Sequence, residues 1–359
     1  MNLNIANHPS ELLKKEWIEI IRTDAAQAEK NKRLTDKQLA LFYSQKWFLA
    51  LVPKIYGGLE WTLPEIVRFE EAIGWVDGSA GWVFTLCSGA GWFGGYLDEN
   101  FAKLIFANPK ACLAGSGAPT GIFEALENEY QISGNWKYAS GAPDATVFTA
   151  NCISKNDSEI IQSFCFLKNE VGISSSWSEI GLVASAGHSF ELVKNEVPKN
   201  RIFAIDENHP IINTALYRYP FHPLAGATVG ANLSGMTIHF IEECKKYFSI
   251  KKGKDGNLLS ENAHLNSIVL DLEGQLENVR QELFTNVEST WQDVVAEKLD
   301  IDYSHVNESA QSLARTCRDI VNMLFPYCGL TIMHHDTLLN QIWRDFQTGS
   351  QHALFFPEL

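Results

Sequence analysis

Ser140 and Gly141 stand at the end of a run, residues 134–141, that also contains two aromatic residues. A serine hydroxyl both donates and accepts hydrogen bonds, and a glycine lets a ligand approach the backbone closely. Trp136 and Tyr138 could cover the face of a flat ligand and exclude water from it. A Ser-Gly pair also ends many ordinary strands, so the run is compatible with a binding site and with a simple turn.

His352, close to the end of the chain, is a second candidate for chemistry. It follows Asp345 by seven residues, which predicts that both side chains face one side of a final helix. A neutral imidazole there could take a proton from a substrate hydroxyl, because its pKa lies near neutral pH. A single helical histidine is more often a packed or solvated residue, and Arg344 with Asp345 could form a structural ion pair inside the helices.

Three further sets of residues give weaker signals. Residues 115–117, Gly-Ser-Gly, predict a short loop at a strand end that could admit a ligand, with Ser116 as its polar member. Trp82 could line a substrate pocket, although an aromatic residue on an apolar helix usually belongs to the core. Residues 334–336 are His-His-Asp, but adjacent helical side chains diverge by about 100°, so we expect no metal site.

The elements that must position these residues change their period twice along the chain. Apolar spacing predicts helices over residues 1–108 and again over 209–359, and period-two patterns predict strands over 109–208. The clearest strands are 145–153, 160–167 and 188–193. Between 265 and 287, apolar residues alternate at steps of three and four, which predicts one face of a long helix in a bundle.

The overall composition excludes several classes of function. The net charge of -14 is unsuited to a large nucleic-acid interface, which needs clustered Lys and Arg. No stretch approaches the roughly 20 apolar residues that span a bilayer, so we expect no membrane association. The seven cysteines are odd in number and scattered, which predicts reduced thiols and a cytoplasmic protein.

Four stretches, residues 52–59, 132–141, 181–198 and 338–352, together resemble the acyl-CoA dehydrogenase superfamily over nearly the whole chain. The resemblance implies an α+β fold with an N-terminal helical domain, a central antiparallel β-barrel or sandwich domain and a C-terminal four-helix bundle. The expected domains are 1–108, 109–208 and 209–359. It also implies a homodimer or homotetramer assembled through the bundle.

Within this superfamily, two features indicate the branch of flavin monooxygenases that receive reduced flavin from a partner reductase. Residues 138–141 read Tyr-Ala-Ser-Gly, where fatty-acyl dehydrogenases typically have Trp-Ile-Thr-Asn. The dehydrogenases also need a carboxylate base, and the matching position is Thr348, which cannot take a proton at neutral pH. The alternative position for a base, on the helix over 224–235, contains no Asp or Glu.

The resemblance therefore implies a flavin-dependent oxidoreductase, a monooxygenase that uses reduced flavin and oxygen on a small aromatic substrate. It implies FAD or FMN as cofactor, and oxygen chemistry on reduced flavin requires a dry pocket. Arg280, at the place of the superfamily's clamp for the FAD adenosine, is not followed by the expected glycine, which leaves the flavin type open. The implied catalytic residues are Ser140 and His352, the implied substrate contact is Trp82, and the implied cofactor contacts are Ser116, Trp136, Tyr138, Ala139, Ser140 and Gly141.

Two other functions stay open at this point. One is an FAD-dependent acyl-CoA dehydrogenase acting on a CH–CH bond, with a base delivered by an unexpected loop. The other is a binding or assembly module that has lost its cofactor, which bulky residues such as Phe123 or Trp177 filling the cleft would favour.

Overall fold

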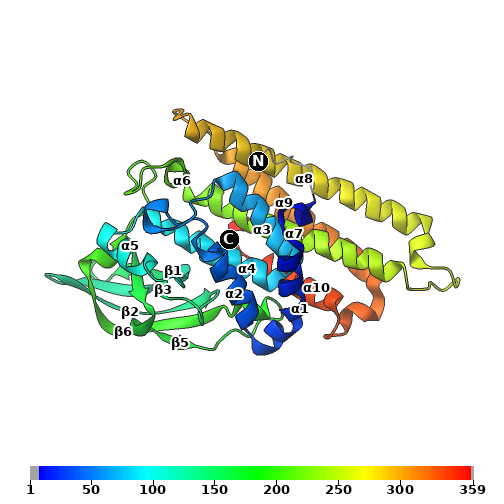
Figure 1. Cartoon of the computed structure of the whole chain (residues 1–359), viewed down its shortest axis with the longest axis horizontal. Helices are drawn as coiled ribbons and strands as arrows, with labels where there is room; N and C mark the ends of the chain where they lie inside the picture. The colour runs from blue at the N-terminus through cyan, green and yellow to red at the C-terminus, as the bar shows by residue number, and fades with distance from the viewer. Residues whose placement is uncertain (1–7, 357–359) are drawn as a thin grey trace.

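The computed structural model describes residues 8–356 and begins with helices (Figure 1). The first five α-helices are α1 (Lys15–Asn31), α2 (Asp36–Ser44), α3 (Leu63–Val76), α4 (Gly78–Gly91) and α5 (Glu99–Phe106). Thr62 and Glu65 form a capping box at the start of α3, and Pro64 lies in its first turn, where its missing N–H costs no hydrogen bond. Asp77 then caps α4, so α3 and α4 follow each other with a single residue between them.

The central part is one sheet, lying at one end of the molecule in Figure 1. Its strands are β1 (Leu113–Ala125), β2 (Glu129–Ala139), β3 (Val147–Ser154), β4 (Ile161–Leu167), β5 (Gly172–Ser174), β6 (His188–Pro198) and β7 (Ile202–Phe203). The order across the sheet is β5-β6-β2-β1-β3-β4-β7. Each pairing between these strands is antiparallel except that of β1 with β3, which is parallel and which the sequence analysis did not anticipate.

Long helices form the C-terminal part and lie on the other side of α4 from the sheet (Figure 1). They are α7 (Phe221–Phe248), α8 (Ala263–Val295), α9 (Ser304–Leu324) and α10 (Leu338–Gly349), and they follow the short four-residue helix α6 (Ala215–Arg218). The apolar residues predicted over 265–287 lie in α8, which packs on α9 and α7. No helix among residues 8–356 is long and apolar enough to cross a membrane.

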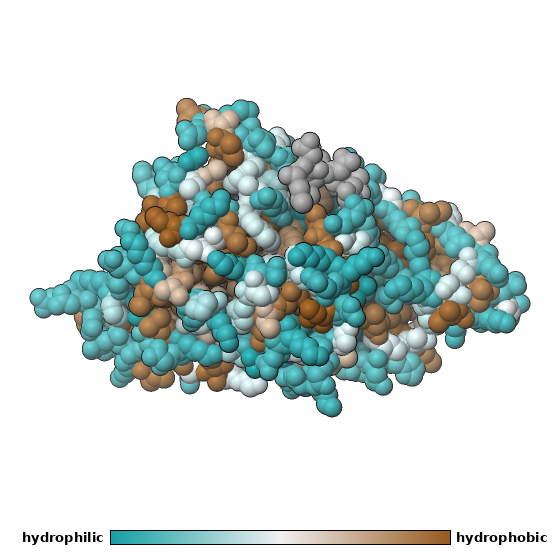
Figure 2. Space-filling view, in the orientation of Figure 1, coloured by the Kyte–Doolittle hydropathy of each residue, from teal (hydrophilic) through white to brown (hydrophobic). Residues whose placement is uncertain are grey.

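The buried hydrophobic side chains of residues 8–356 form two cores rather than three. One extends from the N-terminal helices through α3, α4 and α7 into the bundle. The second lies within the sheet and includes Trp136, Phe148 and Phe190. The face of the molecule in Figure 2 is mostly hydrophilic, with apolar residues in separate patches. The predicted fold class is therefore confirmed, whereas the division into domains at 108 and 208 stays a prediction.

Candidate active site

A cleft lies where the sheet meets α4, α7 and the segment after α10. It has two parts, with volumes of about 880 Å³ and about 520 Å³. We call the 880 Å³ part the outer chamber and the 520 Å³ part the inner chamber. Ser116, Ser140 and His352 border both chambers, so the two parts meet at these three side chains. Volumes of this size are typical of small-molecule and cofactor sites.

A bulge near the end of β2 determines which aromatic residue faces the cleft. The pairing of β2 with β6 shifts register between Trp136 and Ala139, and Tyr138 between them has a φ of 66°. In a regular strand, Trp136 and Tyr138 would face the same side. Here the bulge separates them: Tyr138 is 61% exposed and borders the outer chamber, whereas Trp136 is fully buried.

Trp136 stacks on Phe190 inside the core of the sheet, with ring centroids 5.1 Å apart. Its indole N–H donates to the carbonyl oxygen of Asn151 at 3.0 Å. Trp136, Ala139 and Gly141 border neither chamber, so among the expected ring-covering residues only Tyr138 is placed to contact a ligand.

Ser140 opens the turn that follows β2, and the backbone around it is firmly held. Gly141 has a φ of 75°, which glycine adopts without strain, and its N–H donates to the carbonyl oxygen of Ser185 at 2.8 Å. The Cys87 thiol donates to the Ser140 carbonyl oxygen at 3.5 Å. Within residues 8–356 the Ser140 hydroxyl has no protein hydrogen-bond partner, so it is free to serve a ligand in the cleft.

His352 lies beyond the last helix, because α10 ends at Gly349. The prediction that it shares a helix face with Asp345 was therefore wrong: the chain turns after α10, and His352 caps the short 3-10 helix Ala353–Phe355 instead. Its Nδ1 accepts the N–H of Leu354 at 3.4 Å, which leaves the proton of a neutral ring on Nε2. Burial lowers the pKa of His352, so the ring is neutral at neutral pH.

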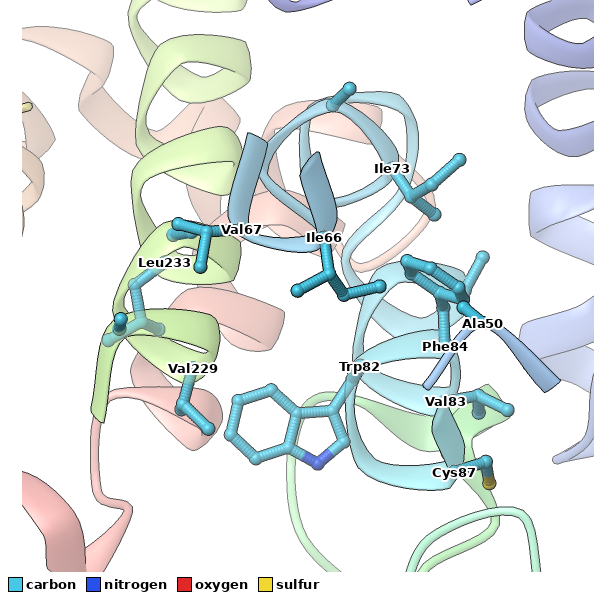
Figure 3. Close-up of a cluster of buried hydrophobic side chains, with 14 of the residues drawn as sticks. Ala50, Ile66, Val67, Ile73, Trp82, Val83, Phe84, Cys87, Val229 and Leu233 are labelled. Carbon is cyan, nitrogen blue, oxygen red and sulfur yellow. The ribbon is translucent and has the colours of Figure 1, made fainter. Parts of the chain in front are cut away.

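Trp82 projects from α4 toward α7 and forms one wall of the outer chamber. Figure 3 shows its ring directed at Val229 and Leu233 of α7. The ring meets the His352 imidazole edge-on, with centroids 5.8 Å apart. Trp82 is only 5% exposed, so it is a core residue and a cleft residue at once.

Ser116 lies within β1 and not in a loop at a strand end, which corrects the prediction for residues 115–117. The pairing of β1 with β3 shifts register between Ser116 and Gly121, so the strand bends next to the cleft. Ser116 and its two glycine neighbours border both chambers. The bend, not a loop, brings these small residues to the ligand.

Thr348, at the position of the dehydrogenase base, also lies at the cleft. Its hydroxyl oxygen accepts the N–H of Gly181 at 3.0 Å. A side chain at position 181 would have its Cβ 2.0 Å from the Arg344 carbonyl oxygen, so only glycine allows this close approach. Among the described residues that border either chamber, Glu179 is the one carboxylate, and its Oε2 accepts the N–H of Ser178.

Arg344 and Asp345 bind the same segment, so they do not form the expected pair with each other. Arg344 donates to the Ile180 carbonyl oxygen at 2.7 Å, and its other partners are Asn340 and Glu29. Asp345 accepts the N–H of Leu182 at 2.5 Å. We call these contacts of α10 with residues 180–182 the α10 clamp, since they hold one wall of the outer chamber.

Arg280 is paired with carboxylates of the protein itself. Its guanidinium forms a bidentate pair with Glu71 at 2.7 and 2.8 Å, and it also pairs with Glu277. The residue is 5% exposed. Arg280 is therefore a structural residue between α8 and α3, and it is not available within this chain to clamp an adenosine.

Several residues that border the cleft were not identified from the sequence. They come from α4, the 3-10 helix Trp92–Gly95, α7, α10 and the segment after α10, and they include Leu86, Phe93, Phe221, His222, Gln347 and Gln351. Trp177 borders the outer chamber without filling it, and Phe123 is packed inside the sheet core.

Residues 334–336 follow the 3-10 helix Phe325–Met333, and residues 8–356 contain no group of three potential metal ligands.

Comparison with known proteins agrees with this geometry. The family described as the acyl-CoA dehydrogenase C-terminal domain matches residues 228–357. An indole-3-acetate monooxygenase from Pseudomonas putida is 22% identical over 337 residues, covering 92% of this chain and 86% of that protein. The chain also resembles the oxygenase subunit HsaA of a flavin-dependent monooxygenase from Mycobacterium tuberculosis, at 22% identity over 94% of this chain and 89% of that protein.

Solved structures share the fold over nearly the full length. The 3-HSA hydroxylase from Rhodococcus sp. RHA1 superposes with a TM-score of 0.87 at 19% identity, covering 99% of this chain and 95% of that one. These matches confirm the resemblance to the acyl-CoA dehydrogenase superfamily and, within it, to the oxygenase components of two-component flavin monooxygenases. The predicted class, a flavin-dependent oxidoreductase, is likewise confirmed.

Proposed function

We propose that this chain is the oxygenase of a two-component flavin monooxygenase and hydroxylates a small aromatic substrate. One observation carries the proposal: the Ser140 hydroxyl, which has no hydrogen-bond partner among the described residues, and a neutral His352 border the same cleft. The residue at position 348 of this cleft is a threonine and not a carboxylate. A dehydrogenase needs a base there, and an oxygenase needs hydrogen-bond donors in a dry pocket.

The residues of the cleft fit a flavin ring. Ser116 and its glycine neighbours leave room beside the strand, and the Tyr138 ring stands at the edge of the outer chamber. A second aromatic ring, Trp177, meets Tyr138 edge-on with centroids 6.1 Å apart. When bound in reduced form, a flavin would supply the activation of oxygen. The flavin could be FAD or FMN, and Ser116, Tyr138 and Ser140 are the residues that we expect to contact it.

The side chains would then act as follows. Ser140 would donate its hydroxyl proton toward the flavin, because no other group in the described protein competes for it. His352 would donate a hydrogen bond from its Nε2–H into the cleft; because its Nδ1 already accepts the Leu354 N–H, the ring in this state acts as a donor and not as a base. Trp82, against His352, would exclude water from the reacting region.

The proposed partners follow from this chemistry. Since the cleft lies at the surface of one chain, a separate reductase could deliver reduced flavin by diffusion. We propose a cytoplasmic homodimer or homotetramer. The seven cysteines are buried and unpaired, as expected in a reducing compartment. Exposed apolar residues on the bundle, Leu270 and Val295 among them, could pack against a second copy.

The strongest alternative is an acyl-CoA dehydrogenase that uses Glu179 as its base. Glu179 is favoured as a candidate only because it is the one carboxylate at the cleft among the described residues. Its Oε2 accepts the Ser178 N–H at 2.8 Å, and this hydrogen bond stabilises the ionised carboxylate and so weakens it as a base.

The test begins with anaerobic titration of the purified protein with oxidised and reduced FMN and FAD. Preferential binding of reduced flavin, followed by incorporation of one ¹⁸O atom from ¹⁸O₂ into an aromatic probe such as resorcinol, supports the proposal. Bleaching of bound oxidised FAD by an acyl-CoA, abolished in Glu179→Gln, would establish the dehydrogenase. If neither flavin binds, the chain is a binding module without a cofactor.

A further inference from the structure

The inner chamber is lined almost entirely by uncharged side chains. Aromatic and aliphatic residues of its walls include Phe93, Phe203, Phe221, Leu224 and Val229. None of the described residues that border it is Lys, Arg, Asp or Glu, and its only titratable side chains are the two histidines at 222 and 352. Residues 1–7 and 357–359, outside the described part, contain no Lys or Arg.

The polar groups of the chamber are largely bonded to the protein. Asn151 donates to the Gly117 carbonyl oxygen at 2.8 Å and accepts from the Ser163 hydroxyl at 2.7 Å. The Thr228 hydroxyl donates to the Ala225 carbonyl oxygen at 3.0 Å. These groups would have to give up protein hydrogen bonds to solvate an anion, which leaves the junction at Ser116, Ser140 and His352 as the polar end of the chamber.

Among the described residues, no arginine borders either chamber, and two arginines that contact neighbouring segments are bonded to the protein, although Nε of Arg318 and Nη2 of Arg344 have no hydrogen-bond partner. Arg344 is held by Asn340, Ile180 and Glu29. Arg318 donates to the Ser350 carbonyl oxygen at 2.5 Å and lies over the ring of Phe356. Among the described residues that border the outer chamber, Glu179 is the one formally charged residue, and it would repel a second carboxylate.

We propose that the substrate is an uncharged aromatic compound, a phenol or heteroarene without a carboxylate. This inference rests on the proposed function and specifies its substrate class. A carboxylate buried without a cation loses its hydration and gains no ion pair, so the cleft selects against it. This restriction does not apply to a flavin, because its phosphate end can extend beyond the residues that border the chambers. A small aromatic acid, in contrast, would lie wholly inside the cleft.

The selectivity is tested with a matched set of probes: 4-hydroxyphenylacetate, its methyl ester and 4-ethylphenol. Binding is followed by quenching of tryptophan fluorescence in the flavin-free and reduced-flavin protein, so the readout does not depend on turnover. We expect the acid to bind roughly a hundredfold or more weakly than the ester and the ethylphenol. Equal binding of acid and ester overturns the proposal.

Two variants make the test specific. Ala225→Lys places a cation on α7 at the border of the inner chamber, and it should strengthen binding of the acid alone; Ala225→Gln, its neutral control, should not. If the wild type binds the acid and His222→Gln abolishes that binding, the exposed histidine supplies the charge and the proposal fails. Charge-selective binding without ¹⁸O incorporation would leave this inference intact and contradict the proposed function.

Discussion

Two buried clusters of charged residues, one between α3 and α8 and one between α10 and residues 180–182, have different roles. In the α8 cluster, Arg280 is paired with Glu71, which also accepts from the Ser234 hydroxyl at 2.5 Å. Every partner there is a helix side chain, so the cluster joins helix to helix. In the α10 clamp, Arg344 and Asp345 bind backbone groups of residues 180–182. That cluster joins the bundle to the wall of the cleft.

The two clusters also differ in their balance of charge. The Arg280–Glu71 pair is neutral overall. Around the clamp, Asp77 and Asp345 are both buried, and burial raises the pKa of Asp77 to about 6 and that of Asp345 well above its ordinary value. We therefore expect the α8 cluster to contribute to stability alone, whereas the clamp should also affect the site and make stability depend on pH.

The largest effect is expected from Glu71→Ala. Removal of one partner leaves Arg280 as a buried charge with only Glu277 beside it, which costs about 3–5 kcal/mol of the free energy of unfolding. Urea denaturation would measure the loss. The fraction of reduced flavin that yields hydroxylated product should be unchanged in the folded variant; a lower fraction would show that the α8 cluster also supports the site.

The second prediction uses pH. The pKa of Asp77 in the folded state, about 6, lies above its unfolded value of 3.8, so its contribution is fully present below pH 3.8 and is lost as the pH rises through 6. The stability of the wild type relative to Asp77→Asn should fall by about 2–3 kcal/mol between pH 4 and pH 7.5. Parallel stability curves for the two proteins would contradict the assignment of pH dependence to this cluster.

The third prediction concerns Asp345. Asp345→Ala leaves the buried N–H of Leu182 without an acceptor, which costs about 1–3 kcal/mol and loosens the wall of the outer chamber. Entry of water should raise the hydrogen peroxide released per flavin oxidised, as measured by a peroxidase assay. Asp345→Asn keeps an acceptor oxygen and resembles the protonated acid, so it should restore low peroxide release. Equal peroxide release by wild type and Asp345→Ala would limit the clamp to a structural role.

The smallest effect is expected from Ser140→Ala, which leaves the backbone of the turn unchanged. Loss of one neutral hydrogen bond, about 0.5–1.5 kcal/mol, predicts a roughly threefold to tenfold decrease in hydroxylated product per flavin. Ser116→Ala serves as a comparison at the other side of the same junction. An unchanged product yield in Ser140→Ala would remove this residue from the catalytic set.

The sequence was sufficient to predict the order of helices, sheet and bundle, because periodic apolar residues extend over whole elements. It also located Ser140, Tyr138 and Trp82 at the cleft. The sequence could not show that Trp136 is buried while Tyr138 faces the cleft. In a regular strand both side chains would lie on the same face, and the bulge that separates them depends on the pairing of β2 with β6. The prediction for His352 was wrong because it continued the last helix past Gly349, although a glycine at that place is a signal for the end of a helix.

The remaining cleft residues could not be predicted for a different reason. Phe93, Phe221 and Leu224 belong to apolar stretches in which nothing distinguishes a cleft residue from a core residue. Which of them face the chamber depends on how α4, α7 and the sheet pack together. The parallel pairing of β1 with β3 could not be predicted either, because strands that pair in parallel need not be neighbours along the chain.

The most direct test of the central claim is rapid mixing of the protein, loaded with reduced flavin, with oxygenated buffer while absorbance spectra are recorded. If the cleft protects reduced flavin during its reaction with oxygen, a transient spectrum distinct from both reduced and oxidised flavin should accumulate and decay faster with an aromatic substrate present. Direct conversion to oxidised flavin at the rate of free flavin, with no transient, would contradict the account.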